Sequence, residues 1–262
     1  MRRIRMRVAI IGAGAIATYV TQALTDTDHV VTATLVRPSK AQPDKGSFGS
    51  VAALPDGLNV VIDCAGHAAL RAHGPDILER GIDLVTVSIG ALADAELLRT
   101  LDSAATRGGA RLYLASGAIG ALDCLQAAKV GNLDSVTYTG RKPPRGWKGS
   151  AAEAVVDLGS LTSGAVTHFE GSARDAALRY PKNANVAAAV AFAGIGFDAT
   201  KVLLIADADV TENTHEVIAK GDFGTFDFRI YGNPLPDNPR SSALAAMSVI
   251  SKIQQLTNVI SL

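Results

Sequence analysis

Residues 7–17 read RVAIIGAGAIA, a short apolar strand that runs directly into the pattern G-x-G-x-x-A. In dinucleotide-binding turns Gly12 permits a tight turn, Gly14 lets the backbone approach a pyrophosphate, and Ala17 lets the next helix pack closely. A glycine pattern alone is weak, but here a strand precedes it and a helical stretch follows it. The residues assigned to a dinucleotide cofactor in this turn are Gly12, Gly14, Ala15 and Ile16.

The residue after the second predicted strand bears on the choice of cofactor. NAD-specific sites usually carry Asp or Glu there, which hydrogen-bonds the ribose hydroxyls. This chain has Arg37 after the β-branched stretch 30–36, and Lys40 follows. A guanidinium favours a 2′-phosphate, which a carboxylate would repel. We therefore expect NADP, or use of both NAD and NADP; an exposed arginine with no ligand is the alternative.

Strands and helices alternate through the first half of the chain. Apolar strands are predicted at residues 59–64, 84–87 and 111–114, separated by helical patterns at 67–79 and 94–107. This alternation predicts an α/β fold with a Rossmann-type, doubly wound parallel sheet, whose ligands bind beyond the carboxyl ends of the strands. The loop residues placed there are Ala65, Gly66 and Ser88 for the cofactor, and Ser116 and Gly117 for the substrate. His67 either touches the cofactor or only begins a helix.

The pattern changes after residue 131. Strands at 135–141, 202–206, 215–219 and 224–231 are joined by short turns, which indicates antiparallel pairing and an α+β arrangement. A strongly apolar helix near the C-terminus is expected to return to the first domain. The predicted domains are a dinucleotide-binding domain at 1–131, completed by the helix 241–262, and an α+β catalytic domain at 132–240.

Composition excludes several classes of protein. With 25 basic and 25 acidic side chains the formal charge is zero, so the chain lacks the basic surface typical of nucleic-acid or anionic-membrane binding. Its apolar stretches are too short to span a bilayer, and the glycine turn interrupts any signal-peptide core. The two cysteines suggest neither a disulfide framework nor a metal site. We expect a cytoplasmic enzyme that needs no metal.

Several separate stretches of the chain resemble the L-aspartate dehydrogenase family. They are GAGAIA at 12–17, SIGALAD at 88–94, SGAIG at 116–120, GRKPP at 140–144, YPKNANVAA at 180–188 and NPLPDNPRSS at 233–242. The last two are the most specific. The resemblance implies a dinucleotide-binding domain with an α+β catalytic domain. It also implies reversible oxidation of L-aspartate by NAD or NADP to iminoaspartate, which hydrolyses to oxaloacetate and ammonia or enters NAD biosynthesis.

The family's residue roles fall on matching positions of this sequence. The resemblance implies that His215, within NTHE, is catalytic, and that Ala118 and Asn185 contact the cofactor. The alternative for His215 is a structural histidine in a strand, and for Asn185 a helix cap. The other histidines outside the loop at 65–67, His168 among them, are expected at the surface.

The chemistry of the reaction asks for the same residue types. An amine must be neutral before a hydride leaves its carbon, and the imine must then be attacked by water, so one histidine of near-neutral pKa can serve both steps. Two substrate carboxylates call for cationic and amide donors. The candidates are Lys182, Asn183, Asn185 and, as a second anchor, Arg240. For Lys182 and Arg240 the alternative is a solvated or salt-bridged surface side chain.

Two other functions stay open from the sequence. One is another Rossmann-type oxidoreductase, similar to dihydrodipicolinate reductase or homoserine dehydrogenase, and the other is a dinucleotide sensor without turnover. The stretch 182–185 and the position of His215 favour the aspartate dehydrogenase. A homodimer is expected, because uncovered antiparallel edge strands tend to pair with a second copy.

Overall fold

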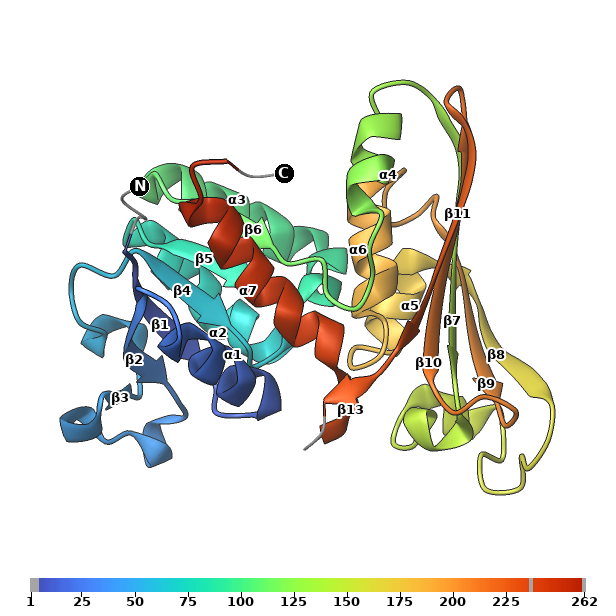
Figure 1. Cartoon of the computed structure of the whole chain (residues 1–262), viewed down its shortest axis with the longest axis horizontal. Helices are drawn as coiled ribbons and strands as arrows, with labels where there is room; N and C mark the ends of the chain where they lie inside the picture. Colours follow the sequence, from blue (N-terminus) through green and yellow to red (C-terminus); the bar gives the residue numbers. More distant parts are fainter. Residues whose placement is uncertain (1–4, 236–237, 261–262) are drawn as a thin grey trace. The chain divides into compact units, whose positions relative to one another are not determined.

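The structure is a computed structural model that describes residues 5–235 and 238–260. The chain forms two compact units (Figure 1). The first unit comprises Met1–Ser88, Asp94–Ala115 and Ala245–Leu262, and the second comprises Ile89–Ala93 and Ser116–Leu244. The division at Ser116 differs from the expected boundary at residue 131. The reason is that the helix at Leu122–Ala128 packs on the helix at Asn185–Ala193, which belongs to the second unit. Ser116, Gly117 and Ala118 thus belong to the second unit.

The first unit has the predicted Rossmann-type architecture. Its sheet has six parallel strands in the order β3-β2-β1-β4-β5-β6. The strands are β1 (Arg7–Ile11), β2 (Val30–Leu35), β3 (Ser47–Phe48), β4 (Val60–Asp63), β5 (Asp83–Thr86) and β6 (Leu112–Leu114). The helices are α1 (Ala15–Thr25), α2 (His67–Glu79) and α3 (Ala95–Gly108), with short 3-10 turns η1 (Pro38–Lys40), η2 (Pro43–Lys45) and η3 (Val51–Ala53). Strands buried on both faces account for the uninterrupted apolar runs of β1 and β4.

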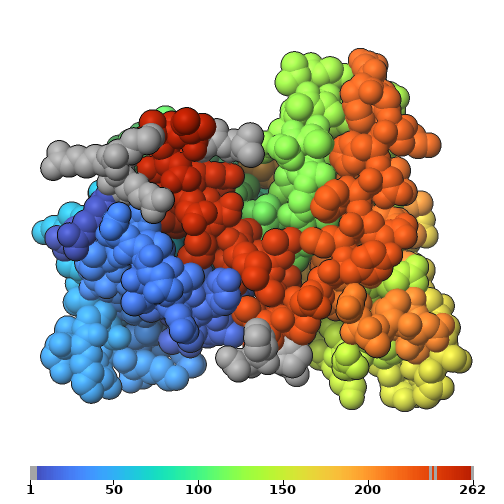
Figure 2. Space-filling model, in the orientation of Figure 1, coloured from blue at the N-terminus to red at the C-terminus, as the bar shows by residue number. Residues whose placement is uncertain are grey.

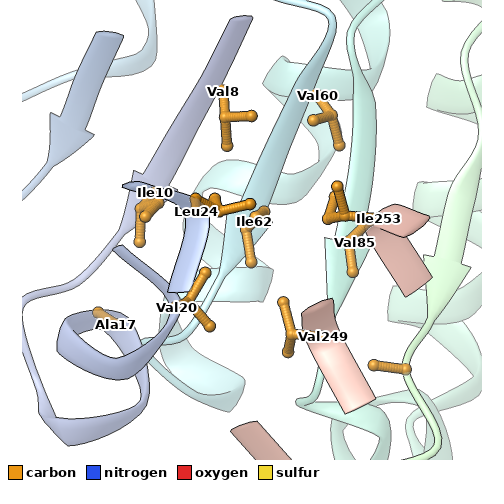
Figure 3. Packing of buried hydrophobic residues seen from close by; sticks show 11 residues of the cluster. Val8, Ile10, Ala17, Val20, Leu24, Val60, Ile62, Val85, Val249 and Ile253 are labelled. Atoms are coloured by element: carbon orange, nitrogen blue, oxygen red, sulfur yellow. The ribbon is translucent and has the colours of Figure 1, made fainter. Parts of the chain in front are cut away.

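The C-terminal helix α7 (Ala243–Thr257) completes this unit, as the sequence predicts. Its Val249 and Ile253 are fully buried in a cluster with Val20 of α1, Ile62 of β4 and Val85 of β5, which also holds the first strand (Figure 3). In the space-filling view the red helix lies against the blue N-terminal segments of the same unit (Figure 2). The helix begins at Ala243 and not at residue 241, because the preceding strand continues to Ser242.

The second unit is built on a five-stranded mixed sheet in the order β11-β10-β7-β9-β8. Its strands are β7 (Leu133–Lys142), β8 (Ala165–Ser172), β9 (Lys201–Asp207), β10 (Asn213–Gly221) and β11 (Gly224–Gly232). The expected antiparallel pairing of consecutive strands holds for β10 with β11 but is wrong for β9 with β10. β7 lies between those two strands, antiparallel to β10 and parallel to β9.

One face of this sheet is covered by helices (Figure 1). The helices are α4 (Leu122–Ala128), α5 (Ala173–Arg179) and α6 (Asn185–Ala193). This unit also contains the 3-10 turns η4 (Ile89–Ala93), η5 (Pro144–Trp147) and η6 (Ala151–Ala154), and the chain further forms a small ladder of β12 (Pro234–Leu235) and β13 (Asn238–Ser242). Along β7, Val136, Tyr138 and Gly140 are buried on the covered face while the residues between them are more exposed. This alternation places Tyr138 and Gly140 under the helices. In the described ranges no helix is long and apolar enough to cross a membrane.

Candidate active site

The glycine turn of the first unit has the geometry that its sequence predicts. Gly12 has a φ of +101°, and a Cβ there would lie 3.1 Å from the Cβ of Ala65. Gly14 is the extended residue before α1, and no atom lies within 4 Å of the place where its Cβ would be. Ala17 is buried in the core below. The turn lies where the strand order reverses, between β1 and β4, and its open backbone at the helix start fits a pyrophosphate.

The loops that follow β4 and β5 are joined by a buried carboxylate. Asp63 is fully buried and accepts hydrogen bonds from Thr86 Oγ1 at 2.7 Å, Ser88 Oγ at 2.6 Å and Ala65 N at 2.9 Å. Burial raises the pKa of Asp63, while these hydrogen bonds oppose the rise. The Ser88 hydroxyl, predicted to contact the cofactor, is therefore committed to Asp63. Ala65 and Gly66, which follow Asp63, lie in the loop beside the glycine turn, and His67 is the first residue of α2.

Arg37 is exposed and lies two residues after the last residue of β2. The backbone N–H of Gly12 donates to the carbonyl of Leu35 at 2.9 Å, two residues before Arg37. The arginine thus stands at the end of the strand next to the glycine turn, together with the exposed Lys40 of η1. In a Rossmann-type unit this is the position that reads the ribose 2′ substituent.

In the second unit, the sheet brings His215 and Tyr138 together. His215 on β10 is 3% exposed and lies opposite Gly140 of β7. The hydroxyl of Tyr138 reaches over Gly140 and lies 2.7 Å from Nδ1 of His215. A Cβ at position 140 would lie 2.7 Å from that hydroxyl, so glycine makes room for the contact. The sequence analysis named His215 as a candidate base but did not identify Tyr138 as its hydrogen-bond partner.

Lys142 lies farther along the same face of β7. Its ammonium lies 5.1 Å from the centroid of the buried Trp147 ring, and burial lowers the pKa of Lys142 to about 8. Burial, and secondly the Lys142 charge, lower the pKa of His215 to about 3. The near-neutral pKa expected of His215 is therefore wrong for the protein without substrate, because the ring is desolvated beside a cation. His215 is neutral at pH 7.

A second buried histidine lies in this unit. His168, expected at the surface, is 4% exposed. It is the extra residue of a β-bulge, since Thr167 and Phe169 pair with consecutive residues of β9. Its ring lies edge-on to Trp147 at 4.3 Å, and its Nδ1 lies 3.2 Å from the hydroxyl of Tyr180. Burial, with the nearby Arg179 and Lys142, lowers the pKa of His168 to about 4.

The residues predicted around 182–185 hold loops of the second unit. Asn185 begins α6, and its Oδ1 accepts a hydrogen bond from Gly90 N at 2.9 Å, which ties η4 to the helix. Asn183 Nδ2 donates to the carbonyl of Gly146 at 3.3 Å, and Lys182 is exposed. Arg240 is in β13, but its side chain lies outside the described part of the chain.

The loop at 116–120 precedes α4 and contains unusual backbone. Gly117 has a φ of +72°, and Ala121, just before the helix, has a φ of +58°. A non-glycine residue in the left-handed region costs about 1 kcal/mol and is frequent in functional loops. Ser116 is half-buried, and Ala118, for which the resemblance implies a cofactor contact, is 8% exposed.

A Rossmann-type unit with an open glycine turn, joined to an α+β unit with a buried neutral histidine, defines a pyridine-nucleotide-dependent dehydrogenase. Residues 12–115 match the family "Homoserine dehydrogenase, NAD binding domain", and residues 123–256 match "Aspartate dehydrogenase, C-terminal".

Relatives over nearly the whole chain narrow the class. The chain is 54% identical to the L-aspartate dehydrogenase of Ruegeria pomeroyi over 96% of this chain and 92% of that protein. It is 44% identical to the L-aspartate dehydrogenase of Cupriavidus necator over 98% and 100%. The crystal structure of aspartate dehydrogenase from Thermotoga maritima matches with a TM-score of 0.78 and 26% identity, over 98% of this chain and 99% of that one. This chain belongs to the aspartate dehydrogenase family.

Proposed function

We propose that this protein is an NAD(P)-dependent L-aspartate dehydrogenase, which oxidises L-aspartate to iminoaspartate and reduces NAD or NADP. The imine then hydrolyses to oxaloacetate and ammonia or is used for NAD biosynthesis, and the reverse direction is reductive amination. The observation that carries the proposal is the neutral, oriented His215 on the covered sheet face of a unit that matches the aspartate dehydrogenase family. A base is what oxidation of an amino acid requires beside a hydride acceptor.

The first unit would hold the cofactor. Gly12, Gly14, Ala15 and Ile16 fit the pyrophosphate, and Ala65 and Gly66 border it, because the open glycine turn leaves backbone N–H groups accessible. Arg37 would contact the adenosine ribose or its 2′-phosphate. Ser88 would act through its bond to Asp63, which orders the loop. When bound, the nicotinamide supplies the hydride acceptor.

The second unit would act on the amino acid. His215 takes the proton of the substrate ammonium group and later activates the water that attacks the imine. For Nε2 to take that proton, the neutral ring must carry its hydrogen on Nδ1, which then donates to the hydroxyl oxygen of Tyr138. The same Nδ1–H bond persists when Nε2 is protonated, so Tyr138 keeps the ring oriented in both states. The two carboxylates of the substrate raise the pKa of His215 from its low value in the free protein.

The remaining candidates keep narrower roles. Ser116 and Gly117 would line the substrate side of their loop, while Ala118 and Asn185 would contact the cofactor. Asn183 and Asn185 also order the turns that they hold, through Gly146 and Gly90. Lys182 and Arg240 would attract the substrate carboxylates.

Replacement of His215 tests the assignment. His215→Ala should lower turnover of L-aspartate by about 10²- to 10⁴-fold, the usual contribution of a general base. The Kd of NADH and NADPH, measured by nucleotide fluorescence, should stay within about twofold, since the first unit is untouched. His73→Ala, in α2 of the first unit, is the matched histidine control. Unchanged turnover in His215→Ala would remove His215 from the mechanism.

We further propose that the enzyme is a cytoplasmic homodimer. The supporting observation is the sheet face opposite the helices, where Tyr231 on the edge strand β11 is 62% exposed. Uncovered strands favour pairing with a second copy. Light scattering coupled to gel filtration should give twice the 27.1 kDa mass of the chain. A mass equal to one chain at micromolar concentration would contradict the dimer.

A further inference from the structure

Lys142 is a half-buried cation without an anionic partner among residues 5–235 and 238–260. Of the described carboxylates, none lies within 4 Å of its ammonium. The neighbouring Arg141, by contrast, is paired with Asp207. Removing an ammonium from water without a counter-charge is costly. An unpaired ammonium of this kind therefore indicates a role in binding a ligand that supplies the counter-charge, or in catalysis.

The stem of Lys142 is held in one direction. A Cβ at Gly146 would lie 3.2 Å from Cβ and 3.4 Å from Cδ of Lys142, so the chain crosses the turn η5 where that residue has no side chain. Its ammonium then lies over the Trp147 ring at 5.1 Å. Lys142 also shares the face of β7 with Tyr138 and is close enough to influence the charge of His215. The cation thus faces the same cluster as the proposed base.

His168 supplies an independent sign of a ligand. Its Nε2 is buried and has no hydrogen-bond partner in the described part of the chain. We assign the Tyr180 hydroxyl as donor to Nδ1, because Tyr180 makes no other side-chain hydrogen bond there, so Nε2 carries the ring hydrogen. A buried N–H without an acceptor is uncommon in native proteins and calls for an explanation.

We propose that Lys142 and His168 bind one carboxylate of the amino-acid substrate, Lys142 as the counter-charge and His168 Nε2–H as a second donor. Both groups border the Trp147 ring, at 5.1 Å and 4.3 Å from its centroid. A carboxylate has two oxygens, so one such group can give Lys142 and His168 the partner that each lacks. The proposal rests on the proposed aspartate dehydrogenase function, because it assigns the substrate's carboxylate to this cluster.

The position also links binding to the base. A carboxylate at Lys142 offsets the positive charge that His215 experiences in the free protein. Only an acidic substrate brings this compensating charge. The same contact therefore selects for a carboxylate and makes the imidazole of His215 a stronger base.

The test uses the full-length enzyme and succinate, a dicarboxylate of the length of aspartate that has no amine to oxidise. Trp147 is the chain's one tryptophan, so its fluorescence reports binding at this cluster, and calorimetry gives the Kd with and without NADP⁺. Lys142→Met should raise the Kd of succinate by about 10- to 100-fold, as expected for loss of a charged hydrogen bond. Lys142→Arg should recover part of the lost affinity. Lys201→Met removes an exposed lysine of the same sheet and should change nothing.

A second pair of variants isolates His168. His168→Asn keeps a polar atom near Nδ1 for Tyr180 and removes Nε2, whereas His168→Gln keeps a donor near Nε2. His168→Asn should raise the Kd of succinate and the KM of oxaloacetate and leave the KM of NADPH unchanged. His168→Gln should retain more of the affinity for succinate.

Outcomes separate the two proposals. Wild-type turnover with an unchanged oxaloacetate KM in both Lys142→Met and His168→Asn would overturn the carboxylate site and leave the function standing. Succinate that binds wild type without altering Trp147 fluorescence would also overturn it. Absence of any oxaloacetate and ammonium turnover in wild type would refute the function, while Lys142-dependent succinate binding would still support the site.

Discussion

Gly140→Ala should uncouple Tyr138 from His215. The added Cβ would lie 2.7 Å from the Tyr138 hydroxyl and 3.2 Å from Leu204 Cδ2. Contact without overlap needs about 3.5 Å, so the hydroxyl must retreat by roughly 0.8 Å. The hydrogen bond, now 2.7 Å long, then exceeds the usual limit of about 3.2 Å.

The cost follows from the two polar atoms that lose their partners. The phenol hydroxyl and the imidazole Nδ1 are both buried, and each unpaired buried group costs about 1–3 kcal/mol. Gly140→Ala should therefore lower the free energy of unfolding by about 2–6 kcal/mol. Tyr138→Phe leaves only Nδ1 unpaired and should cost about 1–3 kcal/mol.

A double-mutant cycle read by urea denaturation checks this reasoning. With phenylalanine at 138 the hydroxyl that obstructs the new methyl group is gone, so Gly140→Ala should cost about 1–3 kcal/mol less in that background. Gly131→Ala is the control, since the nearest atom to its Cβ lies 3.7 Å away, and should change stability by less than about 0.5 kcal/mol. Equal costs of Gly140→Ala in both backgrounds would refute the steric account.

Two further predictions concern charge. His168 and His215 have pKa values near 4 and 3 in the folded protein against 6.5 when unfolded, so the stability from their neutral forms is present above pH 6.5 and is lost as pH falls. Between pH 7 and pH 5 the contribution of each histidine to the free energy of unfolding should fall by about 2 kcal/mol. Urea denaturation of His168→Asn should show a pH dependence shallower by that amount, and an identical dependence would contradict it. Arg37→Ala should raise the KM of NADPH about tenfold or more and leave that of NADH nearly unchanged, because one charge-assisted bond to the 2′-phosphate is lost. Steady-state kinetics with both nucleotides measures this, and a parallel change in both would indicate that Arg37 does not read the 2′ position.

Local patterns predicted the parts of the fold that depend on neighbouring residues. The strand and glycines at 7–17 specify a βα turn by their own conformational needs. Asp94, the first residue of the helical pattern predicted at 94–107, is the N-cap of α3 and accepts hydrogen bonds from Glu96 N and Leu97 N. The apolar pattern of α7 predicted its burial against the first unit.

Pairings between distant residues could not be predicted in this way. Tyr138 meets His215 across 77 positions and Asn185 meets Gly90 across 95, and each depends on sheet register or helix docking that one sequence does not display. His168 was misplaced because a bulge turns it inward against the strand alternation. Asp63 carried a visible signal, a carboxylate at the end of an entirely apolar strand, whose role became clear only from Thr86 and Ser88.

The most direct test of the central claim follows nucleotide absorbance with purified protein, oxaloacetate and ammonium, in parallel with NADH and NADPH. Pyruvate, 2-oxoglutarate and aspartate semialdehyde replace oxaloacetate in matched reactions. The account predicts oxidation that is selective for oxaloacetate and requires ammonium, with a large loss in His215→Ala. Oxidation with oxaloacetate in the absence of ammonium would indicate a hydroxy-acid dehydrogenase, and no oxidation despite nucleotide binding would contradict the proposed activity.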